Sequence, residues 1–300
     1  MGTIPVWLKD FIEKHNATGD EVGIAGVLNH YPLVMRVGRL LLGAPAFLEE
    51  LTALIVRHEP PVEEKPALGR MPTDFTKLHA WMERALTEFL GFEVMVPEPP
   101  TFNQRQRRLL KKMKLRVIFL PDESDEKLAA LKVKSNWSRY LTVDNIERIA
   151  LPGKWVAYEV IPKPNYGDGK YADDKLMAAI GLDSRFNHPH SGKGEGDDLE
   201  GDILPKVAAV LAPLGGKVIL QSAEEFNFLG NFLNWLREKT GEDFPDLGAT
   251  DSWEWCRNSC GVHYRLIVGG RGRGGLSAVC CVWRNGRSIH IAFRVLVVLG

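Results

Sequence analysis

Apolar residues recur at helical spacing in two stretches of the first third of the chain. The first stretch covers residues 47–55. The second runs to Leu90 and is preceded by Thr73 and Asp74, whose side chains are of the type that caps helices. From this periodicity we predict that residues 1–112 form a mainly helical N-terminal region.

Beyond residue 112 the pattern changes to short runs of β-branched and aromatic residues, which are typical of strands. A polar loop rich in glycine and aspartate is expected at residues 183–203. The predicted strands are residues 116–120, 155–161 and 217–220, and the predicted helices are residues 173–180 and the segment opened by the capping box Ser222–Glu225.

Composition narrows the range of function classes. The chain has 45% hydrophobic and 25% charged residues and no net charge, so it has the profile of a globular protein without a general attraction to nucleic acid or anionic membranes. A basic run at residues 105–114 has no interleaved aromatic residues and is interpreted as a solvated helix face. Apolar runs such as residues 295–299 are far shorter than the ~18–20 residues that cross a bilayer. We expect no nucleic-acid partner, no membrane insertion and, from the first ten residues, no secretion signal.

The C-terminal segment has an unusual composition. From Cys256 to Gly300 it contains no Lys, Gln, Glu, Asp, Met, Pro or Thr, and it holds all four cysteines of the chain. Adjacent Cys280 and Cys281 would point to opposite faces of a strand, which disfavours a shared zinc site with Cys256 and Cys260. A disulfide stays open as an alternative, but unpaired thiols are the expectation.

Other chemical motifs are weak. The glycine pattern at residues 270–275 lies between two strand-like runs, whereas a dinucleotide site needs a following helix and a later acid. His188 and His190 near the acids of residues 197–202 could hold a metal but are read as an exposed loop. No acid follows Glu254 to orient a cysteine–histidine pair. We therefore expect no enzyme activity, no metal and no cofactor.

The C-terminal half resembles the variable proteins of diversity-generating retroelements, most closely those of archaeal or viral type. The resemblance covers roughly residues 115–300 and is specific over the last eighty; Ala292 stands where the family usually has glycine. It implies an α+β domain with a C-type lectin-like fold at residues 113–300, whose last strand pairs beside residues 155–161. The matching segments are Ser222–Phe226, Asp251–Trp255, Gly274–Ser277 and Ile291–Val297.

In this family, adenine mutagenesis turns AAC codons into NNC, which excludes Lys, Gln, Glu, Met and Trp. The resemblance thus implies a hypervariable region at about residues 256–292 that binds a variable protein or cell-surface ligand, with a virion or cell-surface location. The alternative is a lectin-fold enzyme or carbohydrate-binding module with a fixed site. Template-fixed structural residues would be Trp253, Trp255, Trp283, Phe293 and Arg294. The predicted variable surface comprises Arg257, Ser259, Cys260, Val262, His263, Arg271, Arg273, Ala278, Cys280, Cys281, Ser288 and His290.

Overall fold

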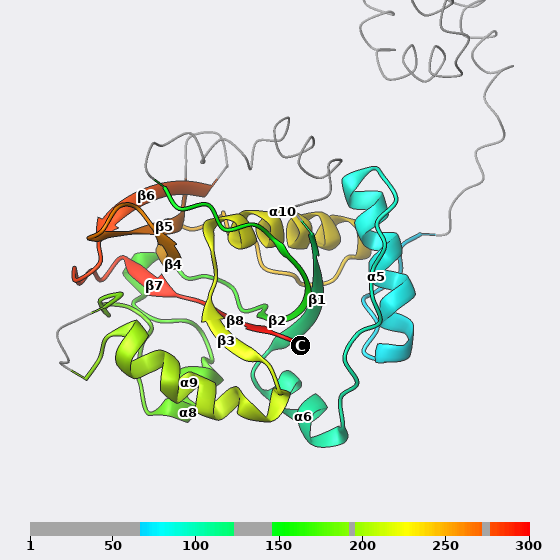
Figure 1. The fold of residues 1–300 in the computed structure, drawn as a ribbon, viewed down its shortest axis with the longest axis horizontal. Helices are drawn as coiled ribbons and strands as arrows, with labels where there is room; N and C mark the ends of the chain where they lie inside the picture. The colour runs from blue at the N-terminus through cyan, green and yellow to red at the C-terminus, as the bar shows by residue number, and fades with distance from the viewer. Residues whose placement is uncertain (1–66, 123–145, 192–195, 272–276) are drawn as a thin grey trace, which may run out of the picture. The chain divides into compact units, whose positions relative to one another are not determined.

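The computed structural model describes one compact unit that begins at Ala67 (Figure 1). The predicted helix at residues 47–55 lies outside the described residues, and the predicted boundary between residues 112 and 113 falls inside the unit. The described ranges are residues 67–122, 146–191, 196–271 and 277–300.

In the described part of the chain, two helices precede the first strand and pack onto the same core as the sheets. Helix α5 (Phe75–Leu90) is capped by the Asp74 side chain, and its buried face carries leucine, methionine and alanine. Phe89 on this helix packs against Phe232 of a later helix at a ring distance of 5.2 Å. Helix α6 (Gln104–Lys112) begins with a capping box, and its arginines and lysines are exposed, as the basic run predicts.

The first sheet has the strand order β1-β2-β8-β3, and every neighbouring pair is antiparallel. The C-terminal strand β8 lies directly beside β2, with Ala157 opposite Val297, so the predicted pairing of the chain's last strand with this early strand is confirmed. The strands are β1 (Leu115–Asp122), β2 (Pro152–Glu159), β3 (Lys217–Leu220) and β8 (Val295–Val298).

Among the described residues, three α-helices lie between β2 and the second sheet along the chain. Helix α10 starts at the predicted capping box, where Ser222 accepts from the backbone N–H of Glu225 and the Glu225 side chain accepts from that of Ser222. The expected polar loop at residues 183–203 ends in a π-helical turn, Leu199–Ile203, which continues into a helix that the sequence pattern did not predict. The three helices are α8 (Lys175–Ile180), α9 (Leu204–Leu211) and α10 (Ala223–Thr240), and short 3-10 turns cover Tyr166–Asp168 and Ala212–Leu214.

The second sheet has the order β6-β5-β4-β7, in which only the β4–β7 pair is parallel. Strands β5 and β6 form an antiparallel hairpin around the glycine-rich segment, so the strand–helix context of a dinucleotide site is not present there. The strands are β4 (Trp253–Ser259), β5 (Tyr264–Arg271), β6 (Ser277–Trp283) and β7 (Ile291–Phe293).

The chain passes from the second sheet to the first at Arg294, the one residue between β7 and β8. Phe293 and Val295 on either side of it are fully buried. The α+β class is thus confirmed for the described residues. None of their helices is long and apolar enough to cross a membrane.

Candidate functional site

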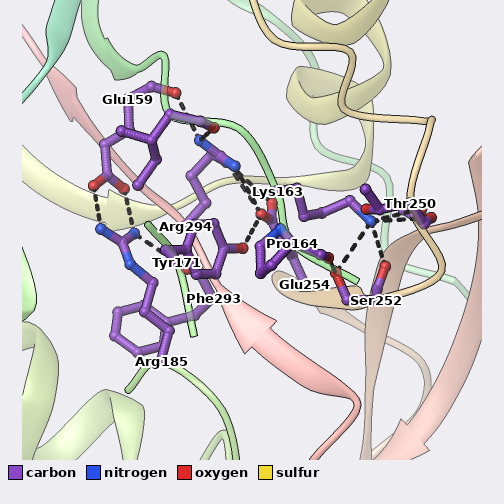
Figure 2. Close-up of polar contacts among 12 residues, drawn as sticks. Glu159, Lys163, Pro164, Tyr171, Arg185, Thr250, Ser252, Glu254, Phe293 and Arg294 are labelled. Carbon is purple, nitrogen blue, oxygen red and sulfur yellow. Dashed lines mark hydrogen bonds and ion pairs between the residues drawn. The ribbon is translucent and has the colours of Figure 1, made fainter. Parts of the chain in front are cut away.

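A buried polar network fixes the crossing between the two sheets (Figure 2). The Arg294 guanidinium donates to the Glu254 carboxylate on β4, with an Nη2–Oε1 distance of 3.0 Å. It also donates to the main-chain carbonyl of Glu159 at 2.7 Å, and Tyr171 donates its hydroxyl to Glu254 at 2.5 Å. Because each end of this network lies on a different element, it holds β4, β2 and the β7–β8 crossing in one arrangement.

A second buried arginine extends the network toward helix α8. Arg185 makes a paired contact with Glu159, at 2.8 and 2.6 Å, and a further contact with Asp174 at 2.8 Å. Burial by itself raises the pKa of Glu254, but Arg294 and its hydrogen bonds hold that pKa below its ordinary value. Burial, followed by the Glu254 charge, raises the pKa of Tyr171 well above its ordinary value. The network therefore keeps fixed charges at neutral pH and acts as a scaffold.

Lys163 holds the end of strand β5 in place. Its ammonium donates to the main-chain carbonyl of Ser252 and to that of Gly269, the latter at 2.9 Å. Burial lowers the pKa of Lys163 to about 8. Gly269 has φ +109°, and a Cβ there would lie 3.1 Å from the lysine nitrogen, so this position requires glycine.

The other end of the same sheet exposes a group of apolar and aromatic side chains, here called the aromatic ledge: Val262, His263, Tyr264 and Trp283. The exposed fractions are 76% for Val262, 41% for Tyr264 and 47% for Trp283. His263 stacks on Trp283 with ring centroids 5.4 Å apart, and Tyr264 meets the same ring nearly perpendicularly at 5.5 Å. Exposed large aromatic side chains gathered in this way are typical of binding surfaces.

A disulfide between Cys260 and Cys281 closes the turn that carries the ledge. It joins the end of β4 to strand β6, while the backbone N–H of Cys260 donates to the carbonyl of Tyr264 at 3.1 Å. The expectation of unpaired thiols is therefore wrong for these two cysteines, because the fold brings their Cα atoms to within 6.2 Å of each other. Cys256 is free and buried, and Cys280 is free and exposed.

The loop of residues 284–290 connects the ledge to β7 and is bound to the preceding polar loop. The backbone N–H of Ser191 donates to the carbonyl of Arg284 at 3.1 Å, and Arg287 contacts Asp197 with two nitrogens, one at 2.7 Å. Arg284 in turn donates its backbone N–H to the carbonyl of His263 at 2.9 Å. The ledge and this loop are therefore linked by main-chain hydrogen bonds.

The predicted variable residues fall into distinct groups. Cys260, Val262, His263 and Cys281 meet at the ledge, and Cys280 is exposed on β6. Two other predicted residues precede β7 at the opposite end of β4: His290, which is exposed, and Ser288, which is half-buried. Arg257 forms an ion pair with Glu225, and Ser259 forms a hydrogen bond with Glu147. Arg271 and Ala278 belong to β5 and β6 with side chains outside the description, and Arg273 lies outside the described residues.

Sequence reasoning missed two members of the ledge. Tyr264 was not among the predicted surface residues, and Trp283 was expected to be structural, whereas its side chain is nearly half exposed. The burial of residues along β6 does not alternate, so the sequence offered no signal for Trp283, and its place beside Tyr264 follows from the strand pairing. Of the other residues expected to be structural, Trp255, Phe293 and Arg294 are fully buried, and Trp253 is half-buried.

The histidine loop is more buried than its composition indicated. His190 is almost fully buried against the Trp255 ring, at a centroid distance of 5.6 Å, so the expectation of an exposed loop is wrong at this residue. Burial lowers the pKa of His190 to about 3. Within the described residues no group of three or more His, Cys, Asp or Glu side chains is arranged to hold a metal ion.

Comparisons of the chain with protein-family models, with curated proteins and with solved structures found no match.

Proposed function

We propose that the chain is a ligand-binding protein of the retroelement-diversified type, whose binding surface is presented by the C-terminal sheet. The observation that carries this proposal is the contrast within residues 256–293. Val262, His263, Cys280 and His290, all predicted to vary, are exposed, whereas Phe293 at the end of the segment is fully buried. A diversified protein needs this separation, because substitutions on exposed positions change binding while the core keeps the fold.

The scaffold beneath the surface supports the same proposal. The buried Arg294–Glu254 pair and the carbonyls around Lys163 hold the sheet by contacts that do not involve the exposed residues. The surface side chains of the ledge can therefore change without removing a partner from this network.

We further propose that residues 113–300 adopt a C-type lectin-like arrangement. The pairing of β8 with β2, which brings the end of the domain beside an early strand, supports this proposal. The exposed positions belong to the second sheet, whereas the β8–β2 pairing belongs to the first, and this separation also supports the proposal.

Sequencing the DNA around the coding region tests the proposed function. We expect a near-copy of the 3′ coding end that differs at adenines, with the mismatches at codons such as those of Val262 and His263. Sister copies should vary at these codons and keep Phe293 and Arg294. The absence of a repeat, or variation that falls equally on the buried codons, would refute the proposal and favour a module with a fixed site.

A further inference from the structure

The rings of the aromatic ledge are stacked on one another. His263 lies nearly parallel to Trp283, with an interplanar angle of 14°, so it occupies one face of the indole. Tyr264 packs against the same ring at 80°. Sugars and unpaired bases bind aromatic side chains through an open ring face, and the ledge uses part of that surface for its own packing.

The ledge also projects from the molecule. Val262 is 76% exposed at the tip of the turn. Two hollows in the described part of the chain, of about 330 and 460 Å³, are lined by other residues, including Arg116 in the first and Lys217 in the second. Small-molecule sites are concave and bury most of the ligand, whereas a projecting aromatic group suits the surface of another protein.

The turn that carries the ledge is held before any partner binds. The Cys260–Cys281 disulfide and the hydrogen bond from Cys260 to the Tyr264 carbonyl close it, and Arg284 donates to the His263 carbonyl. A preorganised surface loses little conformational entropy on association, which favours affinity.

One arginine next to the ledge, Arg284, has no ion-pair partner in the described part of the chain. No aspartate or glutamate occurs after Glu254 in the printed sequence. Arg284 follows Trp283 directly, and among the described residues no carboxylate forms an ion pair with it. Arg265, which follows Tyr264, forms an ion pair with Glu200 at 4.0 Å, and its side chain is only 16% exposed. Arg257, Arg287 and Arg294 are likewise each paired with a carboxylate.

We propose that the ledge binds a folded protein whose contact surface combines an apolar patch with aspartate or glutamate side chains at its rim. Trp283, Tyr264 and Val262 would fill the apolar patch, and Arg284 would receive a carboxylate of the rim. Tryptophan, tyrosine and arginine are the residues that dominate the energetics of protein interfaces. This inference rests on the proposed function, since it names the class of ligand for the same surface.

The test uses the full chain and a display library of a small folded scaffold with randomised surface residues. We expect the selected binders to be enriched in Asp and Glu together with apolar residues. Their affinity should fall at least tenfold with Arg284→Gln and with Trp283→Ala, and it should weaken as salt rises. The matched control is Arg108→Gln on the exposed face of α6, which should leave affinity unchanged.

Unchanged thermal unfolding of Arg284→Gln shows that a loss of binding comes from the missing charge. Binders without acidic enrichment, or binders insensitive to Arg284→Gln, would overturn the inference. So would Trp283-dependent binding of a panel of oligosaccharides or of oligothymidylate, which would identify a sugar or a nucleic acid as the ligand class. The template repeat in the flanking DNA is scored independently, so each proposal can fail without the other.

Discussion

At Arg294 the backbone leaves one sheet and enters the other, and a fully buried guanidinium occupies the crossing. Its partners are the Glu254 carboxylate and two main-chain carbonyls, those of Glu159 and Ile161. A buried charge is tolerated only when it is paired and hydrogen-bonded, so the arginine and its acid depend on each other. The sequence marked this residue through its position in the closing motif, but nothing in the sequence identified Glu254 as its partner.

The protonation of His190 makes the free energy of unfolding depend on pH. Its pKa is lowered by burial to about 3 in the folded chain, whereas an exposed histidine has a value near 6.5. Between these values the unfolded chain binds more protons, so stability is complete above about pH 6.5 and falls as the pH drops toward 3. At pH 4.5 the loss from this residue should be roughly 2–3 kcal/mol.

The expected loss can be measured by urea unfolding at pH 7.5 and pH 4.5, with His190→Phe as the variant, since a phenyl ring also packs against Trp255. The variant should lose less stability on acidification than the parent chain. The charged groups that face His190 are Arg265, Arg284 and Glu200, and they are the same in both proteins. Equal acid sensitivity of the two proteins would show that His190 is not the titrating group.

The turn between β4 and β5 carries a feature that the local sequence pattern does not predict. Runs of β-branched and aromatic residues in the sequence predict β1, β2 and β3 with small shifts at the ends, because such runs are a local signal. The disulfide of Cys260 with Cys281 requires the end of β4 to approach β6, which is a tertiary property. Helix α9 was missed for a local reason: it follows Ile203 without a side-chain cap and has a proline in its first turn.

Reduction of the disulfide should loosen this turn and lower overall stability. The bond closes a segment of 21 residues, and loops of this size contribute about 2–4 kcal/mol. Thiol titration should find one accessible thiol in the native chain, Cys280, and two after denaturation without reductant. After treatment with a dithiol, amide exchange should rise at residues 261–264. A control Cys280→Ser chain should keep the slow exchange before reduction, and rapid exchange in the untreated parent would contradict the prediction.

At the scale of the whole molecule, the extent of the compact unit could not be read from the sequence. The pattern separates helical residues up to 112 from strands after them, but α5 packs its Phe89 ring against Phe228, Phe232 and Trp235 of α10. Periodicity indicates which face of a helix is apolar and does not say which element covers that face. For the candidate surface, the sequence identified Val262 and His263, while Tyr264 and Trp283 required the strand pairing.

A diversified surface should tolerate several substitutions at once with little loss of stability, whereas the core beneath it should not. In a chain with serine at Val262, His263, Cys280 and His290, each substitution should cost about 0.5 kcal/mol or less, and the four together about 1–2 kcal/mol. Phe293→Ala removes a fully buried ring that packs against Arg185 and His188 and should cost ~3–5 kcal/mol. Chemical unfolding of both variants beside the parent chain measures the contrast. If the fourfold variant unfolds as readily as Phe293→Ala, the exposed side chains contribute to the core, and a diversified surface at these positions is ruled out.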